Sequence, residues 1–148
     1  MTKLQPIEKV YEAWTAAVDH RVEIHPASTR DNGSATVTSS DGKKSYSITW
    51  RDGGSVFTSS DPATYWQGYV GYPVLAVLMC QHRLPLPSCA KEFSGINWTE
   101  LNARHRRDYG AALTEVEEQR NIDPEPCAKA ASDTLADLAA LNLTLRRK

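Results

Sequence analysis

The chain has 148 residues, which is typical of one domain, and its apolar share of 41% is enough to build one hydrophobic core. Its 17 Lys and Arg against 18 Asp and Glu give a net charge of −1, so no overall field attracts nucleic acid or an anionic membrane. The longest strongly apolar run, Val74 to Cys80, is far shorter than the roughly 20 residues that span a bilayer. We therefore expect a single soluble domain over residues 1–148, without a membrane partner.

An N-terminal helix is predicted over residues 6–20, where apolar side chains recur at steps of three and four residues.

The chain has three cysteines and no secretory signal, and an odd number of cysteines favours reduced thiols over a disulfide framework. We therefore expect a cytoplasmic location.

Three glycine-containing turns then follow at nearly even spacing, at residues 31–33, 41–42 and 52–54. Apolar and polar residues alternate between them, as in half-buried strands, and a fourth strand is predicted over residues 55–59. One face of this sheet is rich in Ser and Thr and the other is apolar. The fold class predicted is α+β and two-layered, with an N-terminal helix, a four-stranded antiparallel meander, and then three helices on the apolar face of the sheet.

The first segment after the meander is rich in aromatic residues and glycine and ends at Pro73. The proline is expected to interrupt the helix, which begins again there as an apolar helix buried at the centre of the core. In residues 84–91 the apolar residues do not recur at the regular spacing of a helix or a strand, so this stretch is expected to form a loop. One helix is predicted to begin at the cap residue Asn97 and to continue past Val116, and a last one to run from Asp123 through Leu145. The cations at residues 146–148 would then suit the negative end of that helix dipole.

A ligand-binding region is predicted around the aromatic segment, because tyrosine and tryptophan rings can wall a pocket and glycines allow close approach. Core packing between the sheet and the central helix explains the same residues and is the favoured interpretation of the two. The candidate ligand-binding residues are Trp50, Tyr65, Trp66, Tyr69, Tyr72 and Trp98.

The alternative to a binding protein is a small hydrolase or metal-dependent enzyme that uses Cys80, His82 and Cys89. The spacing of these residues differs from the paired ligands of zinc sites, and Cys80 and His82 would point to opposite sides of a helix. We therefore predict no catalytic residue, metal or cofactor.

A third hypothesis is nucleic-acid binding through Arg104, Arg107 and the C-terminal residues Arg146, Arg147 and Lys148. A helix would scatter the cations of residues 104–107 around its axis, so that only Arg104 and Arg107 share a face. Glu100 would lie one turn from Arg104 and neutralise its charge. A solvated helix face is the favoured interpretation.

The sequence does not identify a function, and none of its motifs is specific to an enzyme class. The leading hypothesis is a non-enzymatic binding or protein-interaction module, with a protein partner, a second copy of the chain or a small molecule as ligand. The hydroxyl-rich face of the sheet is a second surface on which a partner could dock.

Overall fold

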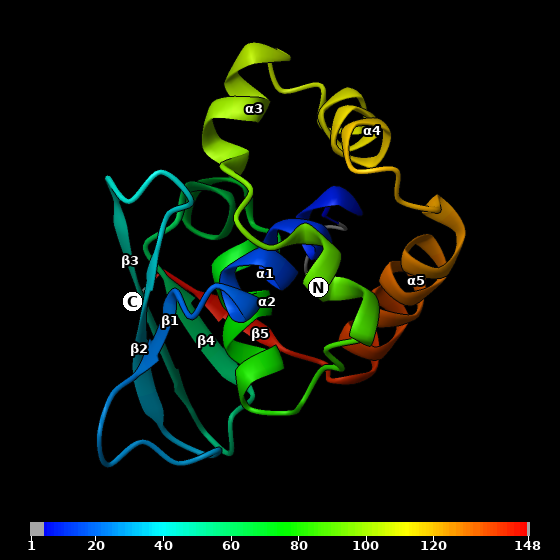
Figure 1. Ribbon diagram of the computed structural model, residues 1–148. Helices are drawn as coiled ribbons and strands as arrows, with labels where there is room; N and C mark the ends of the chain where they lie inside the picture. The colour runs from blue at the N-terminus through cyan, green and yellow to red at the C-terminus, as the bar shows by residue number, and fades with distance from the viewer. Residues whose placement is uncertain (1–4, 148) are drawn as a thin grey trace.

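A computed structural model describes residues 5–147 and has the α+β class predicted from the sequence (Figure 1). The helix α1 (Glu8–Val18) precedes four antiparallel strands, and the remaining helices follow them. The strands of the meander are β1 (Val22–Ile24), β2 (Gly33–Thr38), β3 (Ser45–Arg51) and β4 (Val56–Ser59).

The register of the meander confirms the predicted alternation of faces. Trp50 pairs with Phe57 across β3 and β4, and Ile48 pairs with Ala35 across β3 and β2, with all four side chains buried. The intervening residues, such as Thr49, face outward. A glycine with a left-handed φ of 77° at Gly42 closes the β2–β3 turn, as the hairpin signal predicted.

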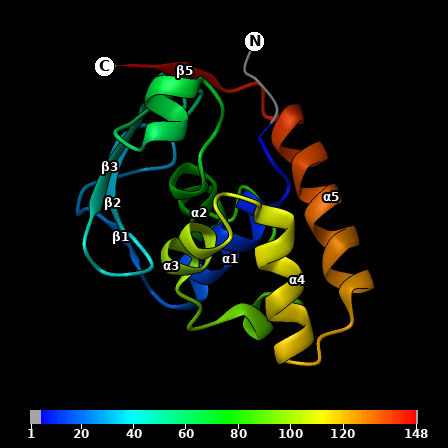
Figure 2. The ribbon, with the colours of Figure 1, turned by 90° about the horizontal axis from the view of Figure 1, so that it is seen from above.

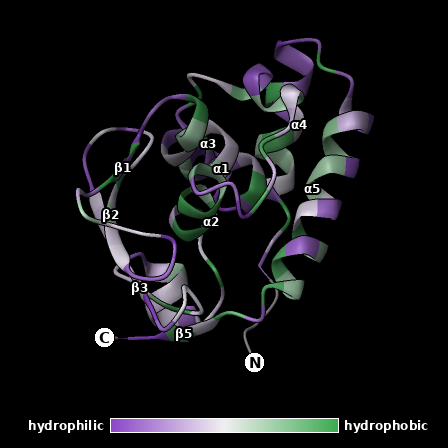
Figure 3. Ribbon diagram, turned by 90° about the horizontal axis from the view of Figure 1, so that it is seen from below, coloured by the Kyte–Doolittle hydropathy of each residue, from purple (hydrophilic) through white to green (hydrophobic). Residues whose placement is uncertain are grey.

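The helix α2 (Tyr72–Cys80) lies between the sheet and the other helices. It contacts all four strands of the meander on one side and α1 on the other. Figure 3 shows the apolar residues concentrated in these two central helices and hydrophilic residues on the outer face of α5 (Pro124–Ala140). The core therefore centres on α2, and the later helices pack mainly behind α1.

The helix expected from Asn97 to beyond Val116 is interrupted in the structure. It forms α3 (Trp98–Arg104) and α4 (Tyr109–Gln119), and Arg106 and Arg107 adopt left-handed backbone conformations between them. The side chain of Asp108 accepts a hydrogen bond from the Ala111 amide and so starts a new helix. The predicted cap at Asn97 is confirmed by its hydrogen bond from the amide of Glu100.

The prediction that the last helix continues to Leu145 is wrong. Helix α5 ends at Ala140, and residues Thr144–Arg146 form a fifth strand, β5, which pairs in parallel with β4. Arg146 and Arg147 therefore follow a strand and not a helix end, and Lys148 lies outside the described residues. The remaining elements are a π-helical turn, η1 (Ala63–Gln67), and a 3-10 helix, η2 (Ser88–Phe93), which takes up the end of the predicted loop.

None of the helices in residues 5–147 is long and apolar enough to span a membrane.

Candidate functional site

A cleft of about 220 Å³ lies where five parts of the chain meet. Its walls come from α1, β3, the η1 segment, the start of α2 and the turn between α3 and α4. We call it the tyrosine cleft. It is lined by Lys9, Tyr46, Asp61, Pro62, Ala63, Gln67, Tyr69, Tyr72, Arg107 and Tyr109.

The floor of the tyrosine cleft is organised by the carboxylate of Asp61, which is only 3% exposed. One of its oxygens accepts a hydrogen bond from the Ser59 hydroxyl, and the other accepts one from the Thr64 amide at 3.1 Å. The hydroxyl of Thr64 in turn accepts the Gly71 amide at 3.0 Å. These bonds tie the end of β4, η1 and the start of α2 together, and they satisfy the buried charge.

The residue at position 71 has to be glycine for this arrangement. A Cβ atom at Gly71 would overlap the carboxylate of Asp61 and would lie 3.1 Å from the Thr64 hydroxyl. The glycine therefore lets the backbone before α2 approach the carboxylate directly.

The α1 wall of the tyrosine cleft carries a buried ion pair. Lys9 Nζ lies 3.1 Å from Glu12 Oε2, which also accepts a hydrogen bond from Asn102 at 3.0 Å. The same ammonium lies 4.1 Å from the centre of the Tyr109 ring. Burial alone would lower the pKa of Lys9, but Glu12 and Tyr109 together raise it above its usual value, so the side chain stays charged.

Three tyrosines of the tyrosine cleft, Tyr46, Tyr69 and Tyr72, are kept in their neutral, hydrogen-bond-donating form. Burial raises the pKa of Tyr46, Tyr69 and Tyr72, and nearby acidic groups add to the effect at Tyr46 and Tyr69. Tyr46 and Tyr72 meet edge to face, with ring centres 6.3 Å apart.

The six predicted ligand-binding residues separate into three groups. Tyr69 and Tyr72 line the tyrosine cleft, whereas Tyr65 and Trp66 point out over the sheet and β5. Tyr65 and Trp66 lie within the π-helical turn η1, an uncommon element that is often found near functional sites, and Tyr69 and Tyr72 follow it in the chain.

The two remaining candidates, Trp50 and Trp98, are 1% and 2% exposed and belong to the core. The indole nitrogen of Trp50 donates to the Thr29 carbonyl, and that of Trp98 donates to the Thr15 hydroxyl. Core packing, the favoured interpretation, describes these two residues. Sequence reasoning missed Lys9, Tyr46, Asp61, Arg107 and Tyr109 as cleft residues, because no local spacing connects them.

The residues of the enzyme hypothesis are placed in different surroundings. Cys80 ends α2, and burial raises the pKa of its thiol, which opposes formation of a reactive thiolate. His82 is exposed, with a left-handed φ of 62°. Cys127 of α5 is buried, and burial together with the neighbouring Cys89 raises the pKa of its thiol. Within residues 5–147, no group of three or more His, Cys, Asp or Glu side chains is arranged to hold a metal ion.

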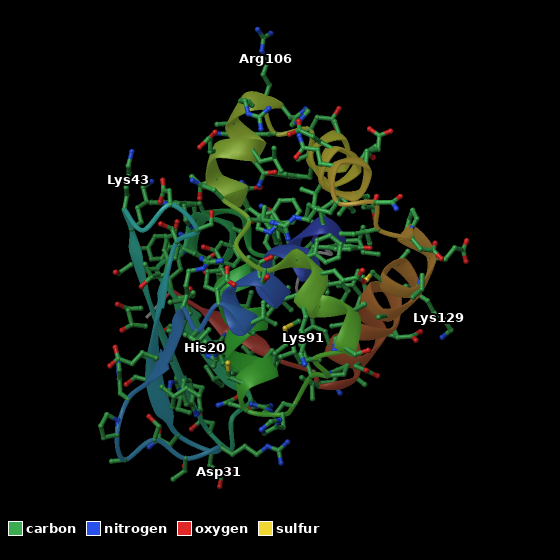
Figure 4. The ribbon with its side chains drawn as sticks, viewed as in Figure 1. His20, Asp31, Lys43, Lys91, Arg106 and Lys129 are labelled. Atoms are coloured by element: carbon green, nitrogen blue, oxygen red, sulfur yellow. The ribbon has the colours of Figure 1, made fainter. Side chains whose placement is uncertain are left out.

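The cations at residues 104–107 are divided between different partners. Arg104 and His105 both bind Glu115, at 3.0 and 2.7 Å, so the expected neutralisation of Arg104 by Glu100 is wrong. Arg106 points away from the protein (Figure 4), and Arg107 lines the tyrosine cleft. Because α3 ends at Arg104, the prediction that Arg104 and Arg107 share a helix face is also wrong.

The fold and the tyrosine cleft describe a small α+β protein with a polar, aromatic pocket at the edge of its helical layer. The chain belongs to the family described as Uncharacterised conserved protein UCP014422, whose model matches residues 2–144. A search of the curated proteins found no match. A search of the solved structures likewise found none.

Proposed function

We propose that this protein is a non-enzymatic binding module, and that its tyrosine cleft takes a small molecule carrying a carboxylate. The observation that supports the proposal most is the meeting of four tyrosines and two cations from separate parts of the chain around one hollow. Core packing does not require such a hollow, and perturbed ionisable groups in a cleft are typical of binding sites.

The chemistry of the tyrosine cleft favours an acceptor-rich ligand. Asp61 already accepts two hydrogen bonds from the protein, whereas the tyrosine hydroxyls and the guanidinium of Arg107 offer donors. A carboxylate accepts several such bonds at once, and charge-assisted bonds of this kind are the stronger ones.

The size of the tyrosine cleft supports a compact ligand. Its volume of about 220 Å³ corresponds to about seven water-sized groups at roughly 30 Å³ each. This is smaller than the roughly 300 Å³ at which drug-sized pockets begin. A small aromatic or aliphatic acid fits the space, with its ring or chain against the tyrosine faces.

The same donors could bind the C-terminal carboxylate of another protein chain. A protein partner would therefore bind in the cleft through its C-terminus. We also propose that residues 1–148 act as one domain and that the protein works in the cytoplasm. The three free cysteines, Cys80, Cys89 and Cys127, support a reducing compartment.

The proposal is tested by nuclear magnetic resonance titration of the labelled protein with benzoate, with the uncharged benzamide as the matched ligand. We expect benzoate to shift the amide signals of Gln67, Tyr69 and Tyr72 with a dissociation constant of about 1 mM, equivalent to about −4 kcal/mol. Benzamide should bind much more weakly. Equal binding of the two ligands, or shifts confined to other surfaces, would contradict a carboxylate site in this cleft.

A further inference from the structure

Trp66 is an exposed tryptophan held in a fixed position. Its side chain is 68% exposed, whereas Trp14, Trp50 and Trp98 are at most 2% exposed. The Tyr65 ring meets it edge-on at 4.7 Å, and the Arg147 guanidinium lies 5.7 Å from its centre. Arg147 Nε also donates to the Tyr65 carbonyl at 3.1 Å, so the guanidinium is anchored to the backbone. The indole thus presents a flat apolar surface that is mostly open to solvent, although the Arg147 guanidinium lies over the ring.

The tryptophan borders two hollows on the outer side of the molecule. One of about 460 Å³ lies over β3 and β4, and the other, of about 500 Å³, lies along β5. Both are lined by Tyr65, Trp66 and Arg147, and Figure 2 shows the short helix of residues 63–67 beside β5. We call these two hollows, which share Tyr65, Trp66 and Arg147, the groove. Their volumes fall within the roughly 300–1,000 Å³ of known ligand sites.

The floor of the groove over the sheet consists of hydroxyl groups. The hydroxyls of Thr49 and Thr58 bond to each other, which leaves one O–H donor and several lone pairs for a ligand. Ser60 Oγ accepts the Ser47 amide at 2.9 Å and keeps its own hydrogen free. The free ends of Arg147 add further donors. The site therefore combines a flat apolar face with alternating donors and acceptors beside it.

We propose that this groove binds an oligosaccharide, with one pyranose ring stacked on Trp66. A sugar ring has an apolar C–H face and a rim of hydroxyls, which matches a tryptophan standing beside Ser and Thr side chains. The charge of the hollow over the sheet also matches a neutral ligand, because Arg147 is the single charged residue among the eight that line it. The hollow along β5 adds one more cation, Arg146. Grooves for single-stranded nucleic acid are strongly cationic along their length, so nucleic acid fits this surface less well.

The test is acrylamide quenching of tryptophan fluorescence in the presence of maltotetraose, cellotetraose or chitotetraose. The quencher reaches Trp66 and not the three buried tryptophans, so a bound saccharide protects one identifiable residue. We expect at least one of the three to protect it in a saturable manner. Changing both Thr49 and Thr58 to Val should weaken that binding by about fivefold to tenfold.

Two variants make the outcome specific. Trp66→Ala should abolish saccharide binding, measured by calorimetry, while benzoate binding in the tyrosine cleft is unchanged. Leu86→Ala removes another exposed apolar side chain, 44% exposed, and should leave saccharide binding intact. Failure of all three saccharides to protect Trp66 would overturn the proposal. Protection by oligothymidylate instead, with an affinity that falls steeply as salt is added, would also overturn it.

Discussion

The indole nitrogen of Trp98 donates to the hydroxyl of Thr15 at 2.8 Å, and that hydroxyl donates to the Phe93 carbonyl at 2.7 Å. One buried threonine on α1 therefore satisfies two polar groups from the segment that leads into α3. This relationship makes Trp98 part of the core and explains how α1 fixes the position of η2 and α3.

Replacing Thr15 by Val should destabilise the fold by about 1–3 kcal/mol, because it leaves the indole N–H and the Phe93 carbonyl buried without a partner. Thr15→Ser keeps the oxygen and loses one methyl group, so its cost should be nearer 1 kcal/mol. Urea unfolding of the two variants measures the difference. Equal stability of the valine variant and the wild type would show that the hydroxyl is not needed there.

Gly71→Ala should destabilise the protein by about 1–3 kcal/mol, because the added methyl group overlaps the Asp61 carboxylate. The matched control is Gly110→Ala in α4, where an added Cβ has no heavy atom closer than 3.8 Å. Alanine in a helix is favoured over glycine by about 1 kcal/mol, so this control should be neutral or stabilising. Loss of stability in both variants alike would argue against a specific contact at Asp61.

Lys9→Met should cost about 3–5 kcal/mol, because it leaves the Glu12 carboxylate buried without its countercharge. The double variant Lys9→Met with Glu12→Gln removes both charges and should recover most of the loss. Thermal or urea unfolding of the two single variants and the double variant gives the coupling. Additive effects of the two changes would mean that the pair does not act as a unit.

Stability should fall at alkaline pH. The folded-state pKa values of Tyr11, Tyr46, Tyr69 and Tyr72 are raised above 10.0, and that of Lys9 is raised above 10.5. A raised folded pKa gives stability that is fully present below the unfolded value and is lost as the pH rises through the folded value. The free energy of unfolding should therefore decline above about pH 10.

Ultraviolet absorbance of tyrosinate checks this directly. Part of the six tyrosines should ionise only as the protein unfolds, and Tyr72→Phe should reduce that delayed fraction. Complete ionisation in a protein that is still folded, judged by circular dichroism, would contradict the burial of these hydroxyls.

The fold was largely predictable because its signals are local. The glycine turns and the period-two alternation predicted the meander, and Asn97 and Asp123 act as the helix caps that the sequence indicated. The fifth strand was missed because its three residues continue an apparent helical pattern. Only their pairing with β4, a contact between distant parts of the chain, makes them a strand.

The tyrosine cleft could be predicted only in part. Tyr69 and Tyr72 were among the candidates because aromatic residues cluster in one segment. Tyr65 and Trp66 lie on another surface because they belong to the π-helical turn. No pattern in the sequence predicted that turn. Arg107 enters the cleft through a left-handed turn that interrupts a predicted helix. The site therefore depends on tertiary geometry that sequence spacing does not contain.

The most direct test of the carboxylate site compares two neighbouring arginines in calorimetric titrations with benzoate. Arg106 and Arg107 both have left-handed backbones and both are exposed, but only Arg107 lines the tyrosine cleft, while Arg106 points away from the protein (Figure 4). Changing either one to Gln alters the net charge equally. We predict that Arg107→Gln weakens benzoate binding by about tenfold or more and that Arg106→Gln leaves it unchanged. Equal affinities of the two variants would contradict the assignment of the cleft as the binding site.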